Sequence, residues 1–255
     1  LLGERKLNIS LLTSQTSEKD TKEIRAKLRR GEIDIIVGTH SLIQESVEFA
    51  DIGLAVVDEQ HRFGVDQRAA LRNKGNSAAI PDLLVMTATP IPRTAAMTVY
   101  GDLDVSILNE LPEGRIPVET RRVADTPELW NEVKAQILEG RQVFIVCPLI
   151  DESENIDTTS AEVTYHRLND DELREMSVGL LHGRMHPSEK QNVMDSFRNG
   201  ELNALVSTTV IEVGVNIPNA TAMVILGAER FGIAQLHQLR GRVGRGSFQS
   251  ICYLV

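Results

Sequence analysis

The chain has 255 residues, more than one average domain of about 100 to 200 residues. Its composition of 42% hydrophobic, 25% charged and 4% aromatic residues excludes a disordered, collagen-like or disulfide-scaffold protein. The formal net charge of −9 argues against a simple basic module that binds nucleic acid, because neutralising phosphates needs cationic surface.

Short apolar runs alternate with segments of helical periodicity, which is typical of βαβ units and parallel sheets. In the first half of the chain this pattern predicts strands at residues 7–12, 33–39, 53–59, 83–89 and 105–108. It predicts helices at 17–30, about 66–74 and about 92–100. Ser17 or Thr16 would cap the first of these helices, and Gly31 would end it.

Residues 109–118 (NELPEGRIPV) carry two prolines and a glycine without periodicity, as expected for a linker. The pattern then resumes, with helices predicted at about 126–139, 187–198 and 233–240, and strands at 142–149, 178–183, 203–209, 221–227 and 249–255. The acidic stretch 151–175 is predicted to be a solvated loop and the start of a helix. The sequence therefore predicts an α/β protein with two tandem lobes, 1–110 and 119–255, joined by a linker at 111–118.

Neither end of the chain has an apolar run of 18 residues or a leader peptide, so we expect no membrane contact. The chain starts without methionine, and we expect it to be a piece of a longer protein. Cys147 and Cys252 lie in apolar runs and are predicted to be reduced core residues of a cytosolic protein.

The run VVDEQH at 56–61 is the first candidate site. Asp58 and Glu59 follow a buried strand, at the carboxyl end where open α/β sheets bind ligands. One carboxylate can hold Mg²⁺, and its neighbour can orient or deprotonate the water that attacks a γ-phosphate. The alternative is an ordinary strand-to-loop junction with solvated acids.

Two other strand ends carry small hydroxyl residues. In TATP, at 87–90, Thr87 and Thr89 can hydrogen-bond to the neighbouring acidic strand end; the alternative is a cap before the helix led by Pro92. The run STTVIEVGVN at 207–216 offers hydroxyls and a glycine that suit a phosphate.

The run QLHQLRGRVGRG at 235–246 sets Arg240, Arg242 and Arg245 among glycines after a predicted helix. Arginines three residues apart lie on one side of a helical turn and can clamp phosphate oxygens. An arginine can also stabilise the charge that develops on a transferring γ-phosphoryl group. A flexible basic surface loop is the alternative.

In this order and spacing, the segments resemble motifs II, III, V and VI of superfamily-2 helicases. The runs DEQHRFGVDQR (58–68), MTATPIPRTAAMTVYGDLDVSILNELPEGR (86–115) and LLHGRM (180–185) look like the RecG branch-migration helicases, over essentially the whole chain. The transcription-repair coupling factor shares HRFGV and TATPIPRT, and a duplex-DNA translocase of that type is an alternative. Gln60 and the GDLDVS and ELPEGR stretches favour RecG.

The resemblance implies two RecA-like lobes, the first truncated at its N-terminus, that close on ATP and move along duplex DNA to remodel forks and Holliday junctions in recombination and repair. It makes Asp58 a Mg²⁺ ligand, Glu59 the residue that activates water, and Arg242 and Arg245 arginine fingers. Further nucleotide contacts would come from Gln60, His61, Gly214, Asn216 and Gln238. Thr87, Ala88 and Thr89 would couple the nucleotide site to the DNA. The DNA backbone would be contacted by Gly38, Thr39, His40, Thr208 and Thr209.

Two departures from the family pattern stand out. The sequence contains no G-x-x-x-x-G-K-[ST] phosphate loop, and Asn216 stands where many relatives have an aspartate. We therefore expect this chain alone to have little or no ATPase activity.

For the parent protein, the resemblance implies ATP and Mg²⁺ as cofactors. Its expected partners are branched or duplex DNA and the missing N-terminal domains, in a monomeric motor of the bacterial cytosol and nucleoid. A non-catalytic nucleic-acid-binding module remains an alternative, although pure binding requires neither the acidic pair nor the arginine pair.

Overall fold

The computed structural model describes residues 6–44, 46–58, 74, 80–87, 104–108, 110, 115–148, 157–208 and 217–255. Packing divides the chain into two compact units, Leu1–Pro90 and Ile91–Val255. The predicted linker at 111–118 lies only partly among the described residues, and the lobe boundaries drawn from it stay predictions.

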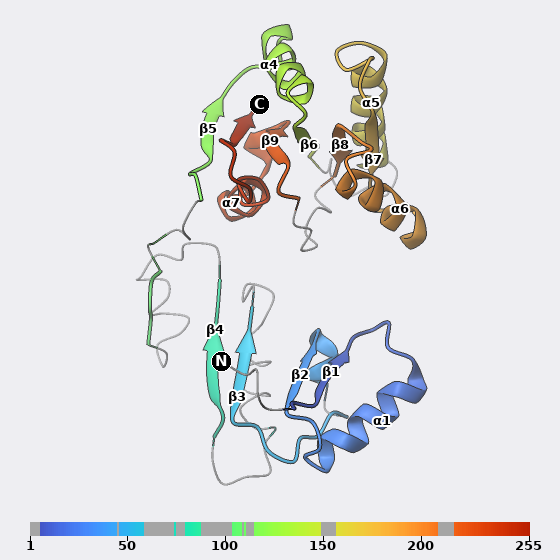
Figure 1. Ribbon diagram of the computed structural model, residues 1–255, viewed down its shortest axis with the longest axis vertical. Coiled ribbons are helices and arrows are strands. Elements are labelled where there is room, and N and C mark those ends of the chain that lie inside the picture. Colours follow the sequence, from blue (N-terminus) through green and yellow to red (C-terminus); the bar gives the residue numbers. More distant parts are fainter. Residues whose placement is uncertain are drawn as a thin grey trace. The chain divides into compact units, whose positions relative to one another are not determined.

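The described residues of the first unit form four short strands in two parallel pairs (Figure 1). In chain order its elements are β1 (Ile9–Leu12), α1 (Glu18–Arg29), β2 (Ile35–Gly38), a 3-10 turn (His40–Leu42), β3 (Leu54–Val57) and β4 (Asp82–Val85). Strand β1 pairs with β2, and β3 pairs with β4. Each of these strands, and the first helix, lies where the sequence predicted it.

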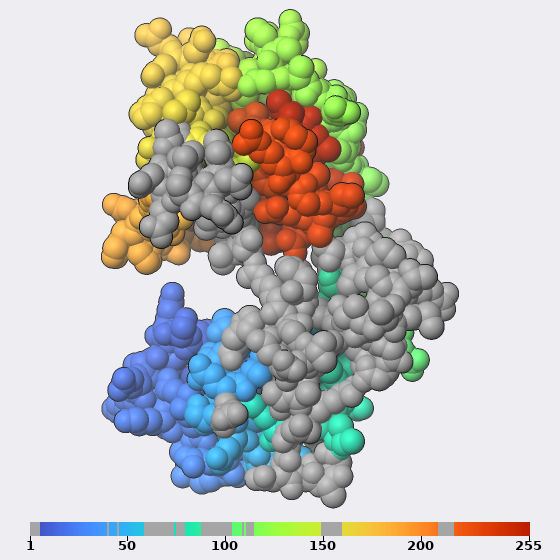
Figure 2. All heavy atoms as spheres, turned by 180° about the vertical axis from the view of Figure 1, so that it is seen from behind, coloured from blue at the N-terminus to red at the C-terminus, as the bar shows by residue number. Residues whose placement is uncertain are grey.

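Helix α1 begins and ends where its sequence provides caps. The Ser17 hydroxyl accepts a hydrogen bond from the Asp20 amide at 3.1 Å, which satisfies a donor of the first turn. Gly31 follows the helix with a φ of +69°, a conformation that glycine adopts at low cost. Leu28 is buried in a small core with Leu12. Figure 2 shows the N-terminal residues, in blue, at the surface of this unit.

One predicted strand is wrong. Residues 104–108 are described and form no strand. The side chains of Val105, Ile107 and Leu108 are 55%, 70% and 96% exposed. A strand needs a partner for its backbone N–H and C=O groups, and the described part of the chain provides none for this apolar run. The predicted helices near 66–74 and 92–100 lie almost entirely outside the described residues.

The second unit is built on one parallel sheet of six strands in the order β5-β10-β9-β6-β8-β7. Its elements are β5 (Glu119–Arg122), α4 (Pro127–Leu138), β6 (Gln142–Val146), α5 (Asp157–Asp170), β7 (Val178–Leu181), α6 (Pro187–Arg198), β8 (Ala204–Ser207), β9 (Ala220–Ile225), a 3-10 turn (Ala228–Arg230), α7 (Ile233–Arg240) and β10 (Ile251–Leu254). Helices α6 and α7 have the bounds that the sequence predicted. The α/β class and the parallel sheets are thus confirmed.

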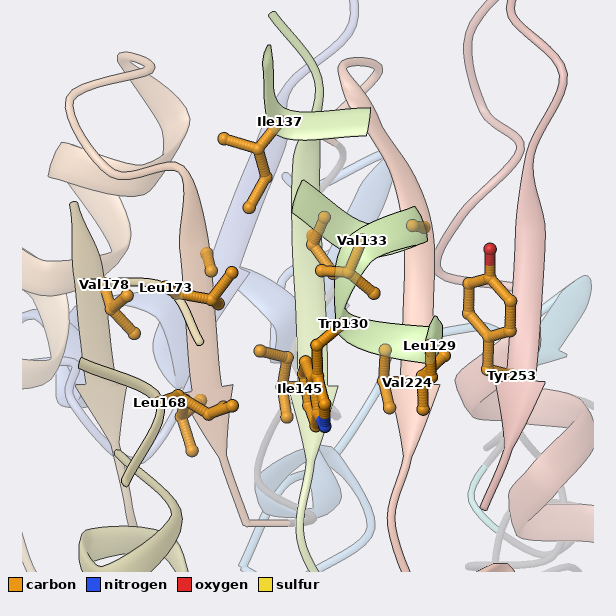
Figure 3. Close-up of a cluster of buried hydrophobic side chains, with 14 of the residues drawn as sticks. Leu129, Trp130, Val133, Ile137, Ile145, Leu168, Leu173, Val178, Val224 and Tyr253 are labelled. Carbon is orange, nitrogen blue, oxygen red and sulfur yellow. The ribbon is translucent and has the colours of Figure 1, made fainter. Parts of the chain in front are cut away.

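Two apolar cores cover the two faces of this sheet. Along β6, Val143 and Ile145 point to the core formed with α4 and α5, and Phe144 and Val146 point to the core that includes Phe197 of α6. Figure 3 shows the first core, in which side chains of α4 lie over the sheet. Each such side chain stabilises the fold by about 1.5–3 kcal/mol when fully buried. Strands buried on both faces need helices on both sides, which explains the alternation of strands and helices.

Two elements of the second unit differ from prediction. The edge strand β5 (ETRR) was missed, because its side chains are all exposed and give no apolar alternation. The acidic stretch 151–175, predicted to be a solvated loop and the start of a helix, contains the whole 14-residue helix α5, which buries Ala161 and Leu168. A few apolar residues at helical spacing are enough to anchor an otherwise acidic helix.

Both cysteines are buried and unbridged, as predicted. Burial raises the pKa of the Cys252 thiol to about 11, so this side chain stays protonated at neutral pH. No helix among the described residues is long and apolar enough to cross a membrane.

Candidate functional site

In the first unit, the ends of β3 and β4 bring two predicted motifs to one edge. The parallel register pairs Val57 with Val85, and the Met86 amide donates to the Val57 carbonyl at 2.8 Å. Asp58 and Thr87 therefore follow the carboxyl ends of adjacent strands, and both are exposed. Open α/β sheets bind their ligands at this edge.

The oxygen donors at this edge fit a hard cation. Mg²⁺ in phosphate-transfer sites is usually held by one or two carboxylates, water and the substrate phosphates. The exposed carboxylate of Asp58 meets this requirement. The other predicted members of this group, Glu59, Gln60, His61, Ala88 and Thr89, lie outside the described residues.

Three residues predicted to contact DNA lie at or just after the end of β2. Gly38 lies opposite Leu12 of β1, and a Cβ atom at this position would overlap the Leu12 carbonyl oxygen. The Thr39 hydroxyl lies 3.0 Å from that of Ser41, which donates to the Leu12 carbonyl at 3.3 Å. The backbone of His40 begins the 3-10 turn. Hydroxyl groups beside a close backbone approach suit contact with a phosphate.

In the second unit, Thr208 follows β8 at the carboxyl edge of the sheet. Its amide donates to the Leu181 carbonyl at 3.3 Å. Its side chain is 1% exposed, and its Oγ1 has no hydrogen-bond partner among the described residues. A buried hydroxyl without a partner is destabilising, by about 1–3 kcal/mol. The other predicted residues of this segment, Thr209, Gly214 and Asn216, lie outside the described part of the chain.

The predicted arginine pair lies in a short loop after α7, the arginine loop (residues 241–246). The amides of Gly241 and Arg242 donate to the carbonyls of His237 and Leu239 at 3.0 and 2.9 Å, so the helical turn continues into the loop. Gln238 is half-buried on the last turn of α7. Arg242 therefore leaves the helix in a defined direction.

Close packing defines the rest of the arginine loop. Gly244 is buried with a φ of +74°, and a Cβ atom there would lie 2.5 Å from Cγ2 of Val118. A Cβ atom on Gly246 would overlap the Pro218 carbonyl oxygen. Arg245 Nε donates to the Gly241 carbonyl at 3.2 Å. The two glycines permit this path, and the loop is an ordered part of the second unit.

The arginine loop concentrates positive charge. Burial lowers the pKa of Arg245, and the nearby guanidinium groups of Arg242 and Arg115 lower it further. Arginine nevertheless stays protonated at neutral pH. Three neighbouring guanidinium groups form a site that favours an anion, and arginine can hold phosphate oxygens with two hydrogen bonds.

Arg115 was missed by the sequence prediction. Its Nε donates to the Gly244 carbonyl at 3.2 Å, across 129 positions of sequence. In the sequence it falls in the stretch of prolines and glycine that predicted a linker, and no motif pairs it with the arginine loop. Only the tertiary structure brings the two together.

Comparisons with known proteins cover almost the whole chain. A family model described as DEAD/DEAH box helicase matches residues 2–98, and one described as helicase conserved C-terminal domain matches residues 127–247. The chain is 52% identical over 251 residues to the ATP-dependent DNA helicase RecG of Bacillus subtilis (strain 168), which covers 98% of this chain and 36% of that protein. It is 49% identical to the protein of the same name from Thermotoga maritima, over 98% of this chain and 32% of the relative. It thus spans about a third of the length of these relatives.

Solved structures show the same likeness. A structure of RecG bound to a three-way DNA junction aligns with a TM-score of 0.74 and 45% identity, over 100% of this chain and 32% of that one. The helicase Lhr of Mycobacterium smegmatis, bound to ssDNA and AMP-PNP, aligns over 98% of this chain with a TM-score of 0.66. At 17% identity, this second match shows a common fold.

Proposed function

The chain belongs to the RecG helicases, with two RecA-like helicase domains, and from this premise we propose that it is the motor region of an ATP-dependent DNA helicase. Its substrate is branched DNA, including replication forks and Holliday junctions, remodelled in recombination and repair. The protein works as a monomeric motor in the bacterial cytosol, associated with the nucleoid.

The arginine loop is the observation that carries this proposal. Arg242 and Arg245 lie in a loop defined by packing, and their charges are close enough to lower the pKa of Arg245. Repulsion among like charges is destabilising unless an anion binds there. In the proposed mechanism, these two residues stabilise the negative charge on a transferring γ-phosphoryl group. Gln238, on the last turn of α7, contacts the nucleotide.

The carboxyl ends of β3 and β4, where Asp58 and Thr87 lie, carry the other proposed catalytic groups. Asp58 would hold Mg²⁺, and the ion would supply positive charge against the phosphates of ATP. Glu59 orients and deprotonates the attacking water, and Gln60, His61, Gly214 and Asn216 contact the nucleotide. Thr87 follows the strand next to that of Asp58. With Ala88 and Thr89, it links the state of the nucleotide to the DNA.

The DNA backbone is contacted through strand ends of both units. Gly38 is the last residue of β2, Thr39 and His40 follow it, and Thr209 comes two positions after the end of β8. The predicted contact through Thr208 does not fit the structure, because its side chain is 1% exposed. Backbone contacts of this kind position a motor without reading sequence. This fits an enzyme whose substrate is defined by its branch point.

The proposal is tested by Asp58→Asn and Arg245→Ala in the full-length parent protein. Each change should lower DNA-stimulated ATP turnover by about 10³-fold, which is the scale of a lost arginine finger. The dissociation constant for a three-way junction should stay within about twofold, because the junction is held by other groups. ATP turnover is measured with and without junction DNA, and binding by fluorescence anisotropy.

Two variants serve as matched controls. Asp51 is exposed and precedes β3, at the end opposite to Asp58, and Arg122 is exposed on β5. Asp51→Asn and Arg122→Ala should leave ATP turnover unchanged. Full turnover in Asp58→Asn or Arg245→Ala would overturn the roles assigned to these residues, and absence of ATP turnover in the unchanged parent protein would identify a non-catalytic nucleic-acid-binding module.

A further inference from the structure

We propose that Arg115 is a positioning residue that holds the arginine loop in the direction needed for phosphoryl transfer. The inference deepens the proposed function and rests on it for its catalytic consequence. It stands on the contacts between the arginine loop and the segment 115–119, which are all within the second unit.

The key contact is the hydrogen bond from Arg115 Nε to the Gly244 carbonyl, at 3.2 Å. Gly244 lies between Arg242 and Arg245 in the sequence, so its peptide group sets the path from one arginine to the other. Holding that carbonyl restricts the backbone torsions on both sides. Arg115 therefore acts on both arginines through the backbone of the arginine loop.

The remainder of the segment 115–119 is hydrogen-bonded to Gln249 and Ser250, which follow the arginine loop in the sequence. Gln249 donates from its side chain to the Pro117 carbonyl at 3.2 Å. The Glu119 amide donates to the Ser250 carbonyl at 2.9 Å, where β5 begins to pair with β10. Val118 packs against Gly244, with no room for a Cβ atom there. The contact of Arg115 is thus the first of a series between two ordered segments.

A purely structural hydrogen bond to the Gly244 carbonyl does not need the positive charge of Arg115. Its guanidinium group lies close enough to Arg245 to lower the pKa of Arg245, which opposes folding. A neutral donor would hold the Gly244 carbonyl without this repulsion. Arginine at position 115 is explained if the arginine loop binds an anion, because the additional positive charge then stabilises the state with the anion bound.

The test uses Arg115→Ala, Arg115→Gln and Arg115→Lys in the full-length parent protein. Displacing a catalytic group by about 1 Å can cost about 100-fold in rate. We therefore expect Arg115→Ala to lower kcat for DNA-stimulated ATP turnover by at least about tenfold, with KM for ATP within about twofold. Arg115→Gln keeps an N–H donor and should recover part of the lost kcat. Arg122→Ala is the matched control, from the exposed strand β5.

Hydrogen–deuterium exchange gives a second readout that does not depend on ATP hydrolysis. In Arg115→Ala, the amides of residues 242–246 should exchange faster than in the parent protein, and in Arg122→Ala they should not. Unchanged exchange in Arg115→Ala would overturn the positioning role, even if the parent protein hydrolysed no ATP. So would a kcat that neither Arg115→Gln nor Arg115→Lys raises above that of Arg115→Ala, because both side chains keep a donor for the Gly244 carbonyl. Absence of ATP turnover in the parent protein would instead count against the proposed function.

Discussion

Gly244 shows how one residue controls the geometry of the candidate site. Its φ of +74° lies in the left-handed region, where a residue with a Cβ atom is less stable by about 1–2 kcal/mol. Its Cα also lies against Val118, where a Cβ atom would come to 2.5 Å. Backbone conformation and packing therefore both require glycine between Arg242 and Arg245.

Gly244→Ala should destabilise the full-length protein and lower its ATP turnover, because the arginine loop must move to admit the methyl group. Gly140→Ala is the matched control, since Gly140 has a φ of +82° but nothing within 4 Å of a Cβ position. In the control, the free energy of unfolding should fall by about 1–2 kcal/mol, from the backbone conformation alone. The comparison is made by urea unfolding and by ATP turnover. Equal losses in the two variants would show that the contact with Val118 has no effect.

At the scale of elements, a buried side chain ties the sheet to helix α6. Gln142, at the start of β6, donates from Nε2 to the carbonyls of Phe197 and Leu202 at 2.6 and 2.8 Å. These carbonyls belong to the end of α6 and the segment that follows, where helical partners run out; the Phe197 carbonyl also accepts from the Gly200 amide at 3.2 Å. The Phe197 ring lies 5.0 Å from that of Phe144 on β6. Polar and apolar contacts therefore set the same position for the end of α6.

Gln142→Leu should destabilise the second unit by about 1–3 kcal/mol, because the Leu202 carbonyl loses its side-chain donor while the Phe197 carbonyl keeps the Gly200 amide. Gln191→Leu is the control, because Gln191 is exposed on the same helix and bonds only to the side chain of Asp195 among the described residues. A change within about 0.5 kcal/mol is expected for that surface site. The measurement is the urea concentration at the midpoint of unfolding of this 255-residue chain, followed by the fluorescence of Trp130, its single tryptophan. Similar midpoints in both variants would refute the proposed role of Gln142.

For the whole chain, the distribution of charge matters more than the total of −9. Residues 1–30 carry eight basic and four acidic residues, for +4, and residues 226–255 carry four arginines and one glutamate, for +3. The acidic stretch 151–175 carries nine acidic residues and two arginines, for −7. The negative total therefore does not argue against DNA as a partner, because the chain has local positive regions suited to phosphates.

The two units also differ in how completely their strands are covered. In the second unit β6, β8 and β9 are buried along their whole length. In the first unit Ile9 and Leu11 of β1 are 63% and 60% exposed, and Leu54 and Val56 of β3 are 59% and 54% exposed. Exposed apolar faces of this kind reduce the stability gained from burial.

We predict that the 255-residue chain alone has little or no ATPase activity with junction DNA. Its sequence contains no phosphate loop, so the lysine and hydroxyl that hold the β- and γ-phosphates and Mg²⁺ are absent. The test compares turnover by this chain with turnover by the full-length parent protein at equal concentration. A rate near that of the parent protein would contradict the prediction.

Much of the fold could be predicted from the sequence. Alternating apolar runs and helical periods located β1–β4 and β6–β10, and the bounds of α6 and α7 agree with the structure. The exposed strand β5 could not be found, because its side chains carry no apolar pattern. The apolar run at 105–108 was misassigned, because composition does not reveal whether a neighbouring strand is available to pair with it.

The sequence by itself determined the chemistry of the candidate site: a carboxylate after β3, hydroxyls at strand ends and an arginine pair after α7. Local spacing suffices for this, because the ends of strands and helices carry their own signals. The tertiary structure alone decided which of these groups meet, through the register that puts Asp58 and Thr87 on one edge. It also placed Arg115 on the arginine loop across 129 positions. Contacts over such separations depend on packing and sheet order, and neither is encoded in a local pattern.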